Sequence, residues 1–474
     1  MAFSADIEAF IRDFVKDLEE NNVAVFAGAG MSKGAGFVDW SELLRDIAAE
    51  LELEIEKEHD LISIAQFHVN KRKGPAGLAK KIVEEFSEQA EPTKVHEILA
   101  RLPIRTYWTT NYDTLIEDSL RGAYKIPDIK HSIKQLTTTR PKRDAVVYKM
   151  HGDVSVAQDA ILYKEQYERY HRTHAQFVTA LSGDLVSKTF LFIGFSFNDP
   201  NLDYVLSRLH LEGTAAKHHY CFVRRESIAP GDDEETIGYK RRKQNLRIED
   251  IKRFGIQPLL IDEYSEIPII LSEIEKRYRK KTIFISGSAE DFGSWNRDDG
   301  QKFIHSLSSG LVKGNFRIVN GFGWGIGSAV INGALEAIYR NPEKYSEDQL
   351  IVRPFPQFGD NLKVLWEEYR QRMIALTGVA IFVFGNKLSS GKIISANGVN
   401  REFQIAIERG VVPIPVGATG FAAEEIWNTI NQDPDRYYPG LSWIVPLIKE
   451  LNNPNISRSD LQAKIVKIIQ RLNK

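Results

Sequence analysis

A glycine-rich stretch near the N-terminus, residues 23–32 (VAVFAGAGMS), constrains the fold of this chain more than any other feature. An apolar run of strand length that breaks into glycines is typical of a buried strand that turns tightly into a helix. Gly28 and Gly30 would let the backbone approach a ligand with no Cβ in the way. Amides at the start of the following helix would favour a phosphate. A tight turn without any ligand is the alternative interpretation.

The same pattern recurs along the first half of the chain. Short runs rich in β-branched and aromatic residues alternate with segments of helical spacing, which predicts a parallel sheet covered by helices on both faces. After the first run, the predicted strands are residues 105–110, 145–150, 189–193, 220–223 and 258–261. Ligands of such sheets bind at the carboxyl ends of the strands. Four of the strands end in glycine, polar or ionisable residues, so we expect the functional site there.

The pattern restarts after a charged helical stretch, residues 272–281. The second set of predicted strands is residues 282–285, 316–319, 350–352, 379–384 and 411–416. With 474 residues, the chain is long enough for two or three domains. We therefore expect an α/β protein of two Rossmann-like domains, residues 1–280 and 281–474. Each should be a mainly parallel sheet with helices on both faces.

Composition and charge argue against several classes of function. A net charge of −2 gives no global field for binding nucleic acid or a membrane. The apolar runs are of strand length and too short to span a bilayer. Cys221 is the single cysteine, so a disulfide framework and a cysteine-rich zinc site are both excluded. We predict no metal site, and a reducing cytoplasm fits this composition.

Polar or glycine residues follow three of the predicted strands, and we expect them to lie close together: Gly28–Ser32, Asn111 and His151. Asn111 can orient a ribose hydroxyl or a water, and His151 can act as a general base because imidazole titrates near neutral pH. A core histidine bonded to backbone is the alternative for His151, but its neighbours favour catalysis. Asp113 and Asp153 could orient partners or cap helices, and for Asp153 the cap is favoured.

These residues resemble the signatures of the sirtuin family, over roughly residues 10–265. Residues 28–32 (GAGMS) and 36–40 (GFVDW) resemble the sirtuin glycine-alanine-glycine-x-serine loop and the glycine–apolar–proline–aspartate segment after it. Val38 stands where sirtuins usually have proline. Residues 110–113 (TNYD) resemble the sirtuin asparagine-x-aspartate motif.

Two later motifs extend the resemblance. His151-Gly152 is similar to the catalytic histidine-glycine pair of sirtuins, and residues 194–196 (GFS) to a loop that contacts ribose and phosphate. The resemblance implies NAD as the ligand, with Asn111 and His151 as catalytic residues. The NAD contacts that it implies are Ala29, Gly30, Ser32, Asp39, Asp113, Gly194 and Ser196.

One departure from sirtuins changes the implied reaction. Deacylating sirtuins carry a zinc ribbon with four cysteines, which this chain cannot build. Chemistry on NAD itself remains: hydrolysis to ADP-ribose and nicotinamide, with NAD as substrate, no other cofactor and no metal. Asn111 and His151 would position and activate the attacking water. A dehydrogenase is the competing interpretation, because Glu50 lies where a ribose-binding acid could sit, but Lys33 replaces the third glycine of that fingerprint.

A second glycine-rich loop, residues 321–327 (GFGWGIG), follows the predicted strand 316–319. Its alternating glycines favour a phosphate-binding loop, and packing of a helix on the sheet is the alternative. This half resembles SLOG domains, which are nucleotide sensors related to phosphoribohydrolases. Residues 397–402 (NGVNRE) keep the catalytic glutamate of those enzymes, as Glu402, but lose their double glycine. This favours binding over a second hydrolase activity.

A sirtuin-like half joined to a SLOG half is similar to the Thoeris antiphage effector family, over nearly the whole chain. The resemblance implies an NAD glycohydrolase that is inactive until a cyclic ADP-ribose isomer binds the SLOG half. A TIR-domain partner protein would make that signal, and NAD depletion would stop the infected cell. Family members commonly assemble as tetramers through their sirtuin-like halves. The activator contacts predicted here are Gly287, Ser288, Gly323, Gly325, Arg370, Lys387 and Glu402.

Two other classes of function stay open. The chain could be a nucleotide-binding regulator without turnover, although such a protein would not need both Asn111 and His151. It could also be a sirtuin-like effector that works with a nucleic-acid-binding partner. The dense basic run at residues 240–243 (KRRK) is more simply a solvated helix face, so we do not expect nucleic acid as a partner.

Overall fold

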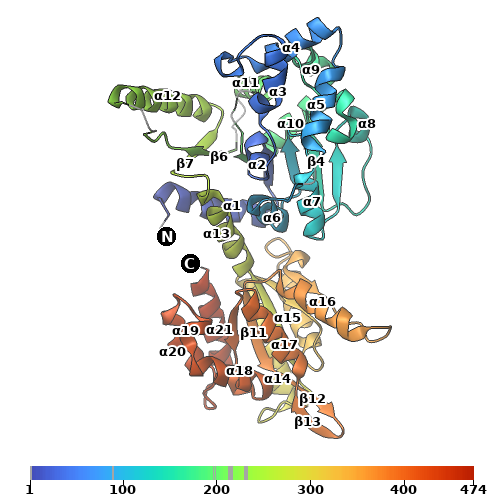
Figure 1. Cartoon of the computed structure of the whole chain (residues 1–474). Coiled ribbons are helices and arrows are strands. Elements are labelled where there is room, and N and C mark those ends of the chain that lie inside the picture. Colours follow the sequence, from blue (N-terminus) through green and yellow to red (C-terminus); the bar gives the residue numbers. More distant parts are fainter. Residues whose placement is uncertain are drawn as a thin grey trace. The chain divides into compact units, whose positions relative to one another are not determined.

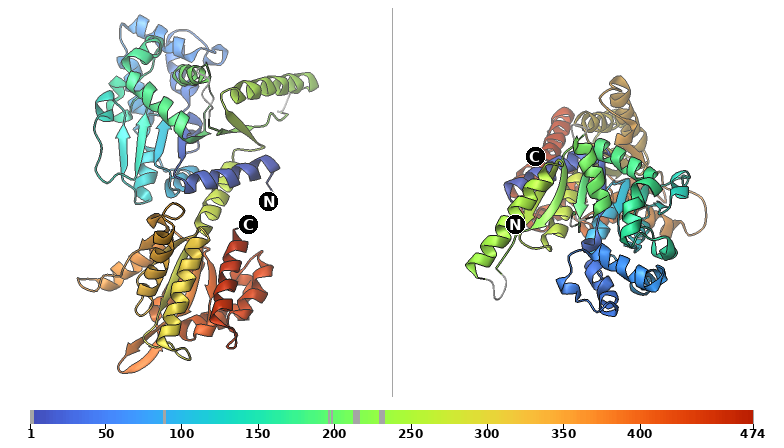
Figure 2. Two further views of the ribbon diagram at one scale, coloured as in Figure 1. Left: turned by 180° about the vertical axis from the view of Figure 1, so that it is seen from behind. Right: turned by 90° about the horizontal axis from the view of Figure 1, so that it is seen from above.

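The computed structural model describes residues 3–87, 90–195, 197, 199–211, 217–228 and 233–473. The chain divides into two compact units, Met1–Glu275 and Lys276–Lys474. The division falls inside helix α13 (Glu266–Lys280), a few residues before the boundary that the sequence placed at 280. Each unit has its own parallel sheet with helices around it, which confirms the predicted fold class (Figures 1 and 2).

The N-terminal unit contains a seven-stranded parallel sheet in the order β3-β4-β2-β1-β5-β6-β7. Its strands are β1 (Val23–Ala27), β2 (Thr106–Thr109), β3 (Pro127–Lys130), β4 (Ala145–Lys149), β5 (Thr189–Ile193), β6 (His219–Arg224) and β7 (Ile256–Ile261). Every residue of β1 is buried, because β2 and β5 pair with it on both sides. The chain adds strands first on one side of β1 and then on the other, so β1 lies at the topological switch point where open sheets bind ligands.

Amphipathic helices cover this sheet. In α1, the residues at helical spacing, including Ile7, Phe10 and Phe14, are buried. Helix α1 is Ala5–Glu19. The other helices of eight or more residues up to α12 are α3 (Trp40–Glu50), α4 (Leu61–Arg72), α5 (Ala76–Phe86), α6 (Lys94–Arg101), α7 (Leu115–Gly122), α9 (Lys164–Thr173), α10 (Ala175–Ser187), α11 (Pro200–Leu211) and α12 (Glu234–Lys252). Helix α12 extends away from the rest of the unit in both views (Figures 1 and 2).

The C-terminal unit has a five-stranded parallel sheet in the order β10-β9-β8-β11-β14. Its strands are β8 (Thr282–Ser288), β9 (Arg317–Asn320), β10 (Leu350–Val352), β11 (Val379–Phe384) and β14 (Val412–Pro415). The main helices are α14 (Arg297–Lys313), α15 (Gly327–Arg340), α16 (Leu362–Ile374), α17 (Asn397–Glu408), α18 (Phe421–Gln432) and α21 (Arg458–Leu472). Strand β11 is buried along its whole length at the centre of a single apolar core.

The sequence missed three strands. Strand β3 carries Asp128 and Lys130, and two charged residues in so short a segment are not typical of a buried strand. In the structure these two side chains are buried and form an ion pair at 2.8 Å. Strands β12 (Asn386–Ser389) and β13 (Lys392–Ser395) form an antiparallel hairpin that protrudes from the C-terminal unit (Figure 1). Lys387, predicted as an activator contact, lies in strand β12. No helix among the described residues has the length and apolar character needed to cross a membrane.

Candidate active site

A chain of hydrogen bonds joins the turn after β1 to the loop after β2. Asn111 Nδ2 donates to the Gly28 carbonyl oxygen at 3.0 Å and to Ser32 Oγ at 2.9 Å. Ser32 Oγ donates to Asp113 Oδ2 at 2.7 Å, and all three polar side chains are buried. Because both amide hydrogens of Asn111 are used, its carboxamide oxygen is the atom that can accept a hydrogen from a ribose hydroxyl or a water.

The glycines at this site allow two loops to interlock. Gly194 follows β5 with a φ of +63°, and a Cβ there would clash with the Met31 amide nitrogen. A Cβ on Gly28 would lie 2.5 Å from the Gly194 carbonyl oxygen, and the Gly30 amide donates to that oxygen at 2.9 Å. Close packing of the loops therefore requires these glycines. The amide of Gly30, a residue predicted to contact NAD, has a backbone partner in this structure.

His151 follows β4 and is 3% exposed. Its Nε2 lies 3.3 Å from Asp199 Oδ2 and 3.3 Å from Asn201 Nδ2, and its Nδ1 lies 3.4 Å from the hydroxyl oxygen of Tyr167. Burial lowers the pKa of His151 below 6.5, and the Asp199 carboxylate opposes this shift only in part. The imidazole is therefore neutral near pH 7, the form in which it can accept a proton.

These side chains line a cavity of about 1680 Å³ in the N-terminal unit. Its volume exceeds the roughly 300–1,000 Å³ of common ligand pockets, so it can hold a molecule as large as a dinucleotide. The predicted site residues on its wall are Ala29, Gly30, Ser32, Asp39, Asn111, Asp113, His151 and Gly194. Ser196, also predicted, lies outside the described residues.

Asp39 has a clear structural role at the wall of this cavity. Its carboxylate caps α3 by accepting from the Ser41 and Glu42 amides, and it pairs with Lys33 at 2.7 Å. Partial burial raises the pKa of Asp39, but the hydrogen bonds from Lys33 and from the helix lower it to about 2. A contact from Asp39 to NAD stays a prediction.

Sequence reasoning missed three residues around His151: Asp199, Asn201 and Tyr167. The polar run after β5 carried a signal for the first two, because side chains at a carboxyl end of the sheet face the same site as His151. Tyr167 lies on α9 and gave no motif. Asp153, predicted as a cap, does cap the short helix η2 (Val154–Asp159), where it accepts from the Ser155 amide at 2.9 Å.

The second glycine loop packs directly on the end of β8. A Cβ on Gly323 would clash with the Gly287 carbonyl oxygen, and one on Gly325, whose φ is +75°, with the Ala289 carbonyl oxygen. The Ala289 amide also donates to the Trp324 carbonyl oxygen at 2.8 Å. Close packing of the backbone therefore requires the alternation of glycines. Contacts from this loop to a phosphate stay a prediction.

Arg370 and Glu402 meet next to β8. Glu402, 7% exposed on α17, accepts from Ser286 Oγ at 2.5 Å and lies 3.4 Å from Arg370 Nε on α16. Burial raises the pKa of Glu402, and Ser286 and Arg370 oppose the shift. Lys387 is exposed on the hairpin, and the hairpin is tied to β8 where Ser288 Oγ donates to the Asn386 carbonyl oxygen at 2.8 Å.

The two protein families that match this chain correspond to its two units. The SIR2-like domain family matches residues 105–249, and the Sir2- and TIR-associating SLOG family matches residues 266–472. The protein named NAD(+) hydrolase ThsA from Bacillus cereus (strain MSX-D12) is 46% identical over 476 residues, which cover 100% of both chains. This chain belongs to the ThsA family.

Two further ThsA relatives support this assignment. The one from Acinetobacter baumannii (strain 532279) is 47% identical over 451 residues, 93% of each chain, and the one from Cytobacillus dafuensis is 43% identical over 484 residues, 100% of this chain and 98% of the relative. The SIR2-like match contains Asn111 and His151 but begins after the glycine turn of residues 28–32. Membership of the ThsA family confirms the resemblance to sirtuin-like and SLOG proteins.

Proposed function

We propose that this member of the ThsA family hydrolyses NAD+ to ADP-ribose and nicotinamide. The observation that carries the proposal is the placement of Asn111 and His151 on the wall of one large cavity, at the switch point of the sheet. The relatives named NAD(+) hydrolase ThsA align with this chain over its full length. The proposed chemistry needs only these side chains and water, with NAD+ as substrate and no metal.

The mechanism follows from the two side chains. Breaking the bond between nicotinamide and ribose builds positive charge on the ribose carbon, and a water must trap it. The Asn111 carboxamide oxygen would hold a ribose hydroxyl or that water, and neutral His151 would take the water's proton. Both ring nitrogens of His151 have protein neighbours. The attacking water must therefore displace one of these neighbours from the ring.

Isotope labelling tests the reaction type. When the purified protein acts on NAD+ in ¹⁸O-enriched water, mass spectrometry should find one ¹⁸O in the ADP-ribose and none in the nicotinamide. Unlabelled ADP-ribose, or a cyclised product without added water, would contradict hydrolysis at the ribose carbon.

The lowered pKa of His151 gives a pH dependence. Because the base must be neutral and burial lowers its pKa, kcat/KM for NAD+ should fall on the acid side with an apparent pKa below 6.5. Asp199→Asn removes a charge that raises the pKa, so it should move this acid limb to lower pH. The measurement is kcat/KM across the acidic range for both proteins. An acid limb above 6.5, or one that shifts upward in Asp199→Asn, would contradict His151 as the base.

We further propose that a cyclic ADP-ribose isomer bound at the SLOG half activates the enzyme, with a TIR-domain partner protein as its source. The resulting loss of NAD+ in the cytoplasm would serve antiphage defence. The active assembly would be a homotetramer. The contacts of half-buried Arg370 and buried Ser286 with the buried Glu402 beside the glycine loop support a nucleotide site. Arg370 offers a guanidinium for a phosphate, and Glu402 a carboxylate for ribose hydroxyls.

Arg370→Gln tests this signal site. The substitution removes the cation beside Glu402, so the activator concentration for half-maximal NAD+ hydrolysis should rise at least about tenfold. Arg401→Gln is a matched control, because Arg401 directly precedes Glu402 on α17 and pairs with Glu367 at 2.6 Å near the surface. Its response should stay within about twofold of the native chain. An unchanged response in Arg370→Gln would place the activator elsewhere.

A further inference from the structure

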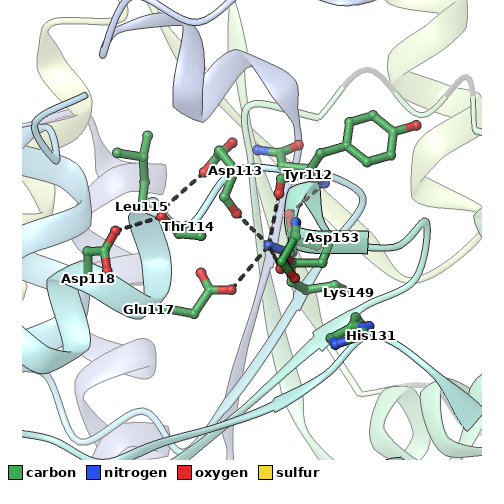
Figure 3. A network of polar contacts seen from close by, with 12 residues as sticks. Tyr112, Asp113, Thr114, Leu115, Glu117, Asp118, His131, Lys149 and Asp153 are labelled. Atoms are coloured by element: carbon green, nitrogen blue, oxygen red, sulfur yellow. Dashed lines mark hydrogen bonds and ion pairs between the residues drawn. The ribbon is translucent and has the colours of Figure 1, made fainter. Parts of the chain in front are cut away.

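Lys149, the last residue of β4, is a fully buried cation at the centre of a polar network (Figure 3). Its ammonium lies 2.5 Å from Asp153 Oδ2 and 3.2 Å from Glu117 Oε1. It also donates to the backbone carbonyl oxygens of Tyr112 at 3.1 Å and Asp113 at 2.5 Å. Burial lowers the pKa of Lys149, but the Glu117 and Asp153 carboxylates raise it more, so the ammonium keeps its charge.

Apart from Glu117, which lies on α7, these partners of Lys149 belong to the two loops that carry the proposed catalytic residues. Tyr112 and Asp113 directly follow Asn111, at the carboxyl end of β2. Asp153 lies two residues after His151, and Lys149 itself lies two residues before it. One ammonium therefore joins the backbone of the Asn111 loop to both sides of His151, as the dashed lines in Figure 3 show for the loop carbonyls and Asp153.

Burying a lysine is costly unless its charge is paired and its donors are used. The sheet carries a second buried lysine that meets this requirement away from the cavity. Lys130 on β3 is 3% exposed, pairs with Asp128 at 2.8 Å and donates to the Thr138 carbonyl oxygen. If each lysine served only to form a buried ion pair in the sheet, Lys130 and Lys149 would have the same role. Of these two lysines, only Lys149 contacts the Asn111 loop.

We propose that Lys149 is a positioning residue that fixes the Asn111 carboxamide and the His151 imidazole relative to one another. The inference rests on the proposed hydrolysis of NAD+. A shift of about 1 Å between reacting groups costs on the order of 10²-fold in rate. The network acts on the geometry of attack and leaves the larger binding surface for NAD+ in place, so its loss should lower kcat with little change in KM.

Lys149→Met in the full-length protein tests the proposal. This variant keeps the length of the side chain and removes the donors, and kcat should fall about 10²-fold while KM stays within about threefold. Lys149→Met with Asp153→Asn provides a second variant that leaves fewer unpaired charges, and asparagine can still cap η2. It should show the same split between kcat and KM. Lys130→Met is the matched control. It should lose a comparable amount of thermal stability but keep the native kcat.

Each outcome decides the question. A native kcat in folded Lys149→Met, or an equal loss of kcat in Lys130→Met, would overturn the positioning role. Failure of both Lys149 variants to fold beside a folded Lys130→Met would replace it with a role in stability. A loss confined to KM would assign Lys149 to binding. Absence of NAD+ turnover in the native chain, with and without a cyclic ADP-ribose isomer, would refute the proposed function itself, and the positioning role with it.

Discussion

Replacing His151 with alanine should lower kcat for NAD+ hydrolysis by about 10²–10⁴-fold, the range that a general base contributes. The neutral imidazole can take a proton from water near pH 7, because burial lowers its pKa. Alanine also removes the contacts to Asp199, Asn201 and Tyr167, so thermal unfolding must be recorded with the rate. The measurement is nicotinamide release under saturating NAD+ and activator.

His219→Gln is the matched control for this loss. His219 is 2% exposed and its Nδ1 accepts from the Phe190 amide at 3.1 Å, so it is as buried as His151 and also hydrogen-bonded. It is the first residue of β6 and therefore lies at the amino end of the sheet, opposite the proposed site. Native turnover is expected in this control. Native turnover in His151→Ala would refute His151 as the base.

Asn111→Ala should reduce turnover by about 10²–10³-fold, the cost of removing one oriented polar group from a reaction centre. The variant loses the hydrogen bonds from Nδ2 to Gly28 and Ser32 as well as the carboxamide oxygen. Ser32 keeps its own bond to Asp113, so the loop after β2 should stay folded. Calorimetric NAD+ binding by this slow variant separates substrate binding from turnover.

Asn111→Asp sharpens the test, because it keeps the shape and replaces the donating nitrogen by a negatively charged oxygen beside Asp113. Repulsion between the two carboxylates should displace the loop, so turnover should also be low in this variant. Native kcat in either Asn111 variant would show that the carboxamide takes no part in the reaction.

The neighbourhood of the candidate site could be predicted because its signals are local. Three short strands, Val23–Ala27, Thr106–Thr109 and Ala145–Lys149, are each followed within two residues by a polar or glycine residue. Parallel strands place such residues at one edge of the sheet. Asn111 and His151 were therefore found from strand ends alone, and the sirtuin resemblance added NAD.

The rest depended on contacts between segments far apart in sequence. Asp199 and Asn201 reach His151 only because β5 pairs with β1, and nothing in their own spacing identifies this partner. The alternating glycines of residues 321–327 indicate a phosphate loop, whereas their packing on Gly287 and Ala289 appears only in three dimensions. Strand β3 was missed because the charges of Asp128 and Lys130 neutralise each other after folding.

The most direct measurement is NAD+ loss by the purified full-length protein, with and without a cyclic ADP-ribose isomer, beside Asn111→Ala. The proposed function predicts turnover that rises with the isomer and is lost in the variant. Turnover that ignores every isomer would keep the hydrolase and refute the signal. No turnover under any of these conditions would contradict the central claim and leave a nucleotide-binding protein without hydrolase activity.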